Sequence, residues 1–414
     1  MPRRVPERSW RKFYLVPAVL IALAPAVGAC TSGSSTASST SSTGAASSTG
    51  SSSASSSSSS SSINLAPFEQ ALAADYKGEF TAPPTSAPTP PKGVNLWIIS
   101  CGQASEGCSE PVANAKEAAQ ALGWKATVFD GNFGIGDAYN AGIRQAIAAH
   151  ATAIITVGVN CNQAKSGYQA ATAAGIVTVG AESYDCNDPA VNDGSPIFSA
   201  TTLFTAQYPS AAAASIQRGI AKADWIIVHT KGQAQVINTD FAGLTGGVYE
   251  NQGFVQEMAK CTTCKIVKTI TFSPADTSDG TLKQEWASAL AQYPNANAGV
   301  IISDGIVIQD GLAQAIQSAG RTKTFSLVSG EGYAVNDSLI RNQDGEDAVV
   351  PFDSNWLAWG AVDTVIRVLD HQPPVDEGMG IQLVDADHNL PAPGQNYSAP
   401  VDYKADYLKI WGVS

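Results

Sequence analysis

Two carboxylates stand where apolar runs of the sequence end, and their chemistry gives the first indication of function. Glu182 follows the run IVTVGA, and Glu331 follows the run FSLVSG. A carboxylate at the end of a buried strand needs a partner. Such a pair can accept hydrogen bonds from ligand hydroxyl groups, or act as acid and base in glycoside hydrolysis. We predict binding and no enzyme, because the sequence has no G-x-S-x-G, Walker or H-E-x-x-H motif.

Other polar and aromatic residues follow apolar runs or begin helical stretches. Besides the two glutamates, the candidates for ligand contact are Gln103, Asn160, Tyr249, Asp353 and Trp356. Acids, amides and aromatic rings with few cations suit a sugar, because carboxylates accept from hydroxyls and rings cover apolar sugar faces. The missing arginines argue against phosphate or carboxylate ligands. A cationic or amine ligand balanced by the two glutamates is the alternative.

The cysteines divide into one near the N-terminus and six in the body of the chain. An even number in an exported chain favours disulfides. Fifteen pairings are possible, and proximity favours Cys101–Cys108, Cys161–Cys186 and Cys261–Cys264. The CTTC at 261–264 has two alternatives, a redox pair or half a metal site. We expect no metal and no other cofactor, because the four histidines are scattered along the sequence.

The N-terminal residues have the layout of an export signal. Five basic residues precede a 17-residue, mostly apolar run that ends in small residues. Val27-Gly28-Ala29-Cys30 resembles the lipobox of bacterial lipoproteins, in which this cysteine is lipidated. We therefore expect residues 1–29 to be a signal peptide and Cys30 to anchor the protein on the outer face of the cytoplasmic membrane. The alternative is an ordinary signal with an incidental cysteine.

A serine-rich stretch follows Cys30. Residues 31–62 contain 20 serines and no charge, so they cannot offset the entropy of ordering. We predict that 30–62 is a disordered tether with a root-mean-square reach of roughly 30 Å, and that 63–91 is an arm or linker.

The charge balance excludes one class of partner. Residues 1–29 hold five of the 24 basic and one of the 36 acidic residues, which leaves 19 basic against 35 acidic and a net charge of −16. Nucleic-acid binding needs clusters of Lys and Arg, so we expect no nucleic acid as partner. About 350 residues remain after the tether, enough for two domains of ordinary size.

From residue 92 onward, strand-length apolar runs alternate with helical patterns. Examples are GVNLWIIS, then EPVANAKEAAQALGW, then KATVFDG. This alternation predicts a parallel sheet with helices on both faces. A second unit of similar build begins near 197–205, where we expect a helix over PSAAAASIQRGIAKA and a strand over DWIIVHT. The fold class is therefore α/β, with two lobes that each contain a doubly wound, mostly parallel sheet.

The ordered set of patterns resembles the type I periplasmic solute-binding proteins, the sugar-binding lipoproteins of bacterial ABC importers. The resemblance rests on DAYNAGIRQAIAAHATAIITVG, AGVIISDG, SLVSGEG, the W..WGAVDTVIRVL helix and an actinobacterial-like ending, VDYKADYLKIWG. It implies a three-stranded hinge at 199–203, 350–355 and 383–387. Lobe 1 would hold 92–198 with 355–383, and lobe 2 would hold 199–354 with 384–414.

The resemblance also implies roles for particular residues. Ser303-Asp304 matches the family's Asn-Asp, which adds Asp304 as a ligand contact, although this residue can instead cap its helix. Glu182 matches the acid of an Asp-Arg pair, and Tyr249 stands where relatives often carry arginine. The implied protein is a monomer that delivers a sugar or polyol to an ABC permease. A receptor that reports to a membrane signalling partner is the alternative.

Overall fold

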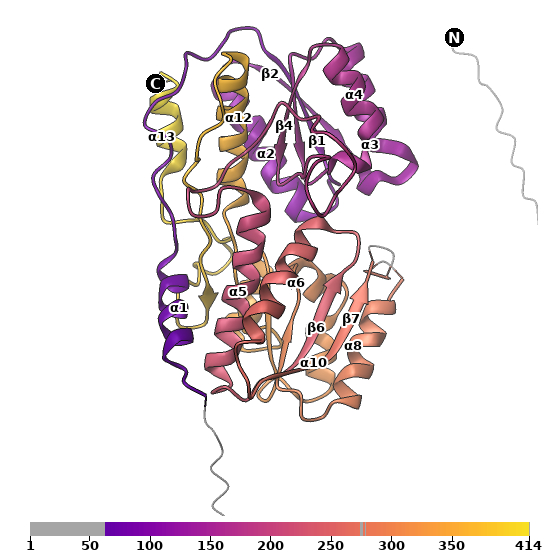
Figure 1. Ribbon diagram of the computed structural model, residues 1–414, viewed down its shortest axis with the longest axis vertical. Coiled ribbons are helices and arrows are strands. Elements are labelled where there is room, and N and C mark those ends of the chain that lie inside the picture. Colours follow the sequence, from indigo (N-terminus) through magenta and orange to yellow (C-terminus); the bar gives the residue numbers. More distant parts are fainter. Residues whose placement is uncertain (1–62, 274–275, 278, 414) are drawn as a thin grey trace, which may run out of the picture. The chain divides into compact units, whose positions relative to one another are not determined.

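The computed structural model describes residues 63–413, apart from 274, 275 and 278. The predicted signal peptide, Cys30 and the serine-rich segment lie outside the described residues. Residues 60–414 form one compact unit, in which two α/β lobes are visible (Figure 1). Within the described ranges, no helix has the length and apolar character needed to cross a bilayer.

Lobe 1 is built on a five-stranded parallel sheet with the order β2-β1-β3-β4-β5. The strands are β1 (Asn95–Ser100), β2 (Lys125–Asp130), β3 (Ala153–Val157), β4 (Val177–Ala181) and β5 (Ala200–Thr201). The connecting helices are α2 (Glu106–Ala121), α3 (Ala138–Ala148) and α4 (Lys165–Ala173), with short 3-10 turns η1 (Asn132–Asp137) and η2 (Cys161–Gln163). This agrees with the predicted alternation.

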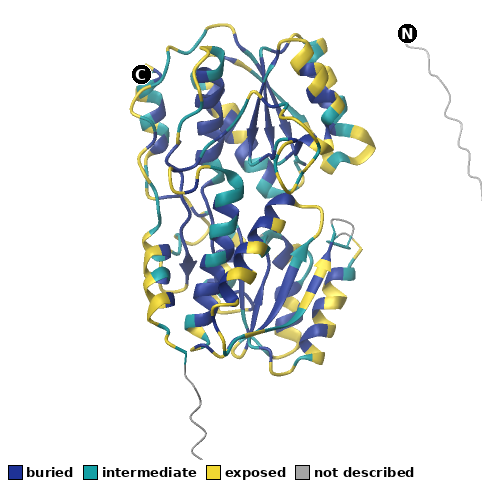
Figure 2. Ribbon diagram, in the orientation of Figure 1, coloured by how far each residue is buried: buried dark blue, intermediate teal, exposed yellow. Residues whose placement is uncertain are grey.

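Alternate residues of β1 explain why its sequence is apolar throughout. Leu96 and Ile98 belong to the core beneath α2 and α12 (Ser354–Leu369), whereas Trp97 and Ile99 belong to the core beneath α3 and α4. Both faces of the sheet are covered, as expected when crossover helices lie on both sides. Figure 2 shows the central strands of both sheets as buried.

Lobe 2 is built on a six-stranded sheet with the order β11-β10-β9-β8-β6-β7. Its strands are β6 (Gln235–Phe241), β7 (Lys265–Phe272), β8 (Ala298–Val300), β9 (Ser326–Ser329), β10 (Ala348–Val349) and β11 (Val384–Asp385). The helix α5 (Ala211–His229) precedes these strands, and the helices between them include α6 (Thr245–Met258), α8 (Thr281–Gln292), α9 (Asp304–Gln309), α10 (Leu312–Ser318) and α11 (Ala334–Asn342). The pairing of β10 with β11 is antiparallel, and the other pairings are parallel.

One predicted strand of lobe 2 is wrong. The run DWIIVHT, at 224–230, is the last part of the single helix α5, and the strand starts later, at Gln235. The β-branched side chains suggested a strand, but the run continues an alanine-rich helix whose first turn is capped by the Ser210 hydroxyl. Its large side chains, such as Trp225, lie in the core. Burial of an apolar helix face overrides the weak local propensity.

Three crossings connect the lobes, as the resemblance implied. The chain crosses after β5, between β10 and α12, and before β11. Isolated bridges join Leu203 to Asp376 and Phe352 to Ile381. The third crossing therefore runs through 376–383, ahead of the predicted 383–387.

The final helix does not lie where the sequence placed it. We grouped 384–414 with lobe 2, but α13 (Tyr403–Ile410) packs against α12. The indole of Trp411 stacks on Trp359 at 5.5 Å and donates to Asp363 at 2.8 Å. Lys404 also pairs with Glu117 of α2. The C-terminal helix thus completes lobe 1.

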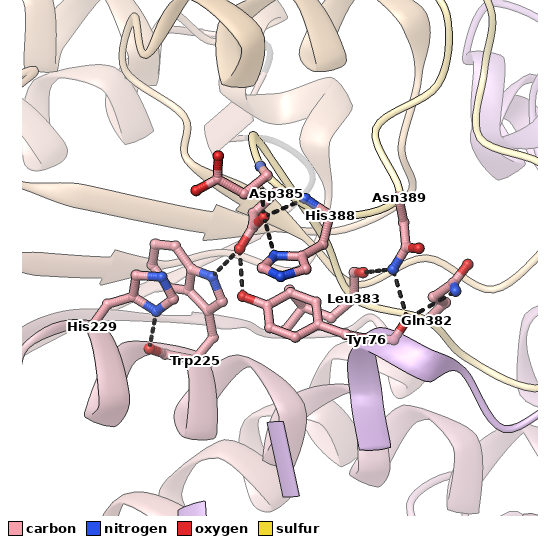
Figure 3. Close-up of polar contacts among 9 residues, drawn as sticks. Tyr76, Trp225, His229, Gln382, Leu383, Asp385, His388 and Asn389 are labelled. Atoms are coloured by element: carbon pink, nitrogen blue, oxygen red, sulfur yellow. Dashed lines mark hydrogen bonds and ion pairs between the residues drawn. The ribbon is translucent and has the colours of Figure 1, made fainter. Parts of the chain in front are cut away.

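The arm before lobe 1 is ordered rather than a loose linker. Its helix α1 (Ala66–Lys77) buries Phe68 and Leu72 in the core shared with α5. The hydroxyl of Tyr76 donates to Asp385, which also accepts from Trp225 at 3.1 Å and contacts His388 at 2.9 Å (Figure 3). Asp385 therefore joins the arm, α5 and β11.

Beyond α1 the arm contacts the hinge and then lobe 1. The amide of Thr81 donates to the Gly378 carbonyl at 2.9 Å, and the guanidinium of Arg367 donates to the Ser86 carbonyl at 2.7 Å. Gly378 and Gly380 allow this approach, because a Cβ on either would meet arm carbonyl oxygens at 2.5 Å and 2.1 Å.

A group of buried acids lies where α1 packs against α5 and α6. Asp224 is 1% exposed, and neither of its carboxylate oxygens accepts a hydrogen bond from a described residue. Burial, together with the nearby carboxylates of Glu257 and Asp75, raises the pKa of Asp224 to about 8, and Lys260 opposes the shift. Burial likewise raises the pKa of Asp75 to about 7. The folded protein therefore holds protons that the unfolded chain releases.

We predict that Asp224→Asn increases stability at pH 8 and changes it little at pH 4. An acid with a raised pKa in the folded state loses stability as pH rises from its unfolded value near 4 to its folded value, by up to about 1.4 kcal/mol per pH unit. The free energy of unfolding, measured with urea at both pH values, checks this. Glu69→Gln, on the exposed face of α1, is the matched control. Equal effects of the two substitutions at pH 8 would contradict the prediction.

Candidate functional site

The carboxyl ends of the parallel strands in the two lobes bring most of the predicted residues to one region. Ligands of open α/β sheets bind at these ends. Lobe 1 contributes the residues after β1, β3 and β4, and lobe 2 contributes those after β6, β8 and β9. The hydrogen bond between Asn160 and Thr245 of α6 shows that the two sets face each other, and the charges of Arg218 in α5 and Glu250 in α6 act on the pKa of Glu182.

Glu182 is held toward lobe 2 by an unusual backbone. It follows β4 directly with φ 49°, a left-handed conformation that costs a non-glycine residue of order 1–3 kcal/mol. The next residue fixes this turn, because the hydroxyl of Ser183 donates to the Thr156 carbonyl at 3.0 Å. Backbone strain maintained by such contacts is typical of functional sites.

The carboxylate of Glu182 is available to a ligand. It is partly buried and accepts no hydrogen bond from any residue that the structure describes. Burial raises the pKa of Glu182 to about 7; the charge of Arg218 opposes the shift and that of Glu250 adds to it. A buried carboxylate without a donor is costly, and a ligand hydroxyl or ammonium would supply one.

Asn160 connects the two lobes. Its amide nitrogen donates to the hydroxyl of Thr245, at the start of α6, at 2.9 Å. Its amide oxygen accepts from the backbone N–H of Tyr184 at 3.0 Å. The side chain is buried and both ends are engaged. It therefore contributes to the contact between the lobes in the structure described.

Tyr249 also connects the lobes. From α6 its hydroxyl donates to Asp188 of lobe 1 at 2.7 Å and accepts from the backbone N–H of Ala190 at 3.3 Å. Its ring lies 5.7 Å from the ring of Tyr184, whose own hydroxyl is 3.2 Å from that of Ser215 in α5. These contacts form a cluster of polar and aromatic side chains that includes Tyr184, two residues after Glu182.

Two buried cations of α5 were missed by the sequence analysis. Lys222 donates to Glu250 at 2.5 Å and to the Ile301 carbonyl at 2.9 Å. Arg218 lies 3.5 Å from the other oxygen of Glu250 and donates to the hinge carbonyl of Val350 at 2.8 Å. Burial lowers the pKa of Lys222, against the opposing charge of Glu250. The available signal was two cations four residues apart in a helix that is mostly apolar.

These cations do not make the cleft basic. Both interact with Glu250, and the acids Glu182 and Glu331 lie on either side of this ion set. Their electrostatic interactions reach Arg218 and Lys222 respectively. Negative and positive groups therefore alternate across the site, from Glu182 through the ion set to Glu331.

Glu331 lines a hollow beside the hinge. The hollow is lined by residues from α2, the segment after β9, the start of α12 and the C-terminal segment, among them Glu110, Tyr333, Asn355 and Asn396. Tyr333 approaches lobe 1 closely, since a Cβ on Gly107 would lie 3.0 Å from its hydroxyl. A second hollow lies in lobe 2 around Asn238, Asn251 and Glu250.

Gln103 and Asp304 lie at strand ends as predicted. The amide of Gln103 donates to the Ser100 hydroxyl at 2.8 Å, and its backbone N–H donates to Asp130 at 2.9 Å. It therefore folds back over the end of β1. Asp304 is the first residue of α9, and its side chain lies outside the described part of the chain.

Asp353 and Trp356 are held by contacts within the protein, although Asp353 lines the same hollow as Glu331. Asp353 caps α12 by accepting from the backbone N–H groups of Asn355 and Trp356, both at 3.0 Å. It also accepts from Ser398 and Ala399. Burial raises the pKa of Asp353, and these donors oppose the shift. The sequence could not distinguish this cap from a ligand-facing acid.

Trp356 is fully buried in lobe 1. Its ring stacks on Tyr403 at 5.4 Å, and its indole N–H donates to the Tyr407 hydroxyl at 3.3 Å. These contacts place it between α12 and α13, so we do not include it or Asp353 in the site proposed below.

The three predicted disulfides are confirmed, as Cys101–Cys108, Cys161–Cys186 and Cys261–Cys264. The first two order loops that border the cleft. The CTTC pair instead closes the turn between α6 and β7, at the amino-terminal edge of the lobe 2 sheet. The pairing opposes the metal alternative, because a disulfide leaves no thiolate to bind an ion.

Comparison with known proteins agrees with this geometry. Residues 98–373 match the family model described as periplasmic binding protein domain. None of the curated proteins compared with the chain matches it in sequence.

Solved structures with the same fold include sugar- and polyol-binding proteins. A galactofuranose binding protein is 18% identical, with a TM-score of 0.57, over 77% of this chain and 99% of its own. The arabinose ABC transporter binding protein from Shewanella sp. ANA-3, bound to L-arabinofuranose, is 18% identical, with a TM-score of 0.58, over 77% and 95%. A solute binding protein from Bacillus halodurans C-125 with bound myo-inositol is 15% identical, with a TM-score of 0.59, over 72% and 96%. At these identities, the likeness establishes the fold.

We predict that Glu250→Gln destabilises the protein by about 3–5 kcal/mol, because it removes the carboxylate between two buried cations. The free energy of urea unfolding at pH 7 measures the effect. Glu117→Gln is the control, since it breaks the exposed pair with Lys404, and exposed pairs contribute about 0–1 kcal/mol. If both substitutions cost the same, the buried ion set has no special structural role.

Proposed function

The chain belongs to the periplasmic binding protein domain family, a family of non-enzymatic transport components, and from this premise we propose that it captures a small polar ligand between its lobes for an ABC importer. The ligand we propose is a sugar or sugar-like polyol. The observation that carries the proposal is the carboxylate of Glu182, which is held at the cleft on a strained backbone without a donor from the described residues.

A polyol supplies the donors that this site needs. Its hydroxyl groups can donate to Glu182 and Glu331 and can accept from the amide of Gln103. The bound arabinofuranose and myo-inositol of the two structural neighbours are ligands of this class. Sequence identity to them is too low to transfer an individual ligand.

Ligand binding would act through lobe closure. A molecule that bridges the lobes favours the closed form by its differential affinity for that form. The permease would then bind the closed protein, which is the state that carries cargo. The hinge is suited to such motion, because three chain crossings and the arm join the lobes there.

An amine-bearing ligand is a second candidate, and one observation favours it. The two buried cations of lobe 2 are engaged by Glu250, and the carboxylate of Glu182, which accepts no hydrogen bond from a described residue, could balance a positive group. An amino sugar would combine both chemistries.

A thermal-shift screen of the purified full chain against sugars, polyols and amines tests the proposal. A ligand should raise the melting temperature with the logarithm of its concentration above saturation. We predict that Glu182→Gln weakens binding by roughly tenfold or more, from the about 1.5–3 kcal/mol of a hydrogen bond to a charged group. Binding should also weaken as pH falls below about 7, because protonated Glu182 is a poorer acceptor.

Two outcomes would contradict the proposed site. We predict that Glu331→Ala also abolishes the thermal shift without unfolding the protein. If both variants bind the ligand with unchanged affinity, the two glutamates are not part of the binding site. Chemical conversion of a bound sugar would contradict a role in binding alone.

We also propose that Cys30 carries the lipid anchor, and that the serine-rich segment spaces the lobes from the membrane. Each CH₂ group of an acyl chain that is buried in the membrane contributes about 0.8 kcal/mol of favourable binding free energy. Cys30→Ala should therefore move the protein from the membrane fraction to the soluble fraction, as measured by immunoblot after ultracentrifugation. Cys261→Ser with Cys264→Ser is the control, and it should leave the protein membrane-bound. Membrane retention of Cys30→Ala would contradict the anchor.

A further inference from the structure

Three side-chain hydrogen bonds join the lobes on one side of the cleft. Asn160 donates to Thr245 at 2.9 Å, the Tyr184 hydroxyl lies 3.2 Å from that of Ser215, and Tyr249 donates to Asp188 at 2.7 Å. We name these six residues the closing surface. Each pair has one member in lobe 1 and one in lobe 2, so every pair separates when the lobes part.

The lobe 1 half of the closing surface lies on two loops that are covalently joined. Asn160 precedes Cys161, and the segment from Tyr184 to Asp188 contains Cys186. The disulfide between these cysteines is completely buried. Backbone and side-chain hydrogen bonds reinforce it, because the Cys161 N–H donates to the Tyr184 carbonyl at 2.9 Å and the Tyr184 N–H donates to Asn160. The loops therefore move as one body.

The lobe 2 half is rigid for a different reason. Ser215 lies on α5, whereas Thr245 and Tyr249 lie on α6. These helices touch through glycines: a Cβ on Gly219 would lie 1.9 Å from the Glu250 carbonyl oxygen, and one on Gly253 would lie 2.0 Å from that of Ile216. Such contact leaves the helices no room to slide, which fixes the spacing of the three lobe 2 groups.

We propose that the Cys161–Cys186 disulfide is a positioning device for lobe closure. It holds Asn160, Tyr184 and Asp188 in the arrangement that matches the rigid α5–α6 surface. This inference rests on the proposed function, in which closure captures the ligand, and it assigns the closed state a ligand-independent set of contacts. Ordering these groups before the lobes meet lowers the entropy cost of closure, so their pre-ordering shifts the population toward the closed form.

Hydroxyl-radical footprinting of the ligand-free full chain tests the proposal, because it measures the solvent exposure of individual tyrosines. Tyr249 is the reporter: it is 8% exposed, its contacts with lobe 1 cover it, and it lies outside the loops that the disulfide joins. In Cys161→Ser with Cys186→Ser, we expect its modification rate to rise several-fold. The fully buried Tyr168 and Tyr407 should remain protected, which checks that each lobe is folded.

Two further variants complete the test. Cys261→Ser with Cys264→Ser removes a disulfide away from the cleft and should leave the rate of Tyr249 unchanged. Thr245→Val keeps all disulfides and removes one hydrogen bond of the closing surface, so it should raise that rate to a smaller degree. If the first variant unfolds, exposing Tyr168 and Tyr407, an unchanged rate of Tyr249 in Thr245→Val would overturn the proposal, because the pairs of the closing surface would then not cover Tyr249.

Unchanged protection of Tyr249 in folded Cys161→Ser with Cys186→Ser would overturn the proposal, as would an equal rise in the variant of the distant pair. A rise at Tyr184 alone would also overturn it, because the disulfide would then order only its own loops. The measurement contains no ligand. Its failure is therefore distinct from failure of the ligand screen, which would instead contradict the proposed function.

Discussion

The ion set of Arg218, Glu250 and Lys222 is the interaction on which the rest of the structure depends. Lys222 is fully buried and Arg218 nearly so, and buried cations are tolerated only with a well-placed carboxylate. Glu250 supplies it from α6, which ties α6 to α5. Lys222 also donates to the carbonyl after β8, and Arg218 donates to the hinge. One ion set therefore joins a helix pair, a strand end and the hinge.

This arrangement determines what the cleft offers to a ligand. Glu250 engages both cations. The surface that a ligand would meet therefore carries carboxylates, amides and tyrosine rings. Glu182 faces Arg218 without reaching it as a salt bridge in the described structure, and its pKa is raised. The electrostatics thus favour a guest that donates hydrogen bonds and disfavour anions, which would need a free arginine.

Much of the fold followed from sequence patterns. Apolar runs alternating with helical periods predicted both sheets, and proximity predicted all three disulfides. Errors arose where tertiary contacts overrode local preference. The run DWIIVHT has strand-forming residues but continues α5, because its bulky side chains fill the core of lobe 2. The final helix returns to lobe 1 through Trp411, a long-range contact that no local pattern reveals.

The site was only partly predictable, and the reason is visible in two acids. Glu182 and Asp353 both stand where a strand or crossing meets the cleft, and burial raises the pKa of both. They differ in their donors. Asp353 accepts from four groups of α12 and the C-terminal segment, two of them more than 40 residues away in sequence, whereas Glu182 accepts from no described residue. Sequence position can place an acid at a cleft, but only the folded chain decides whether its hydrogen-bonding capacity is already used. Availability to a ligand is therefore a property of the tertiary structure, and it is what separates the proposed role of Glu182 from the cap formed by Asp353.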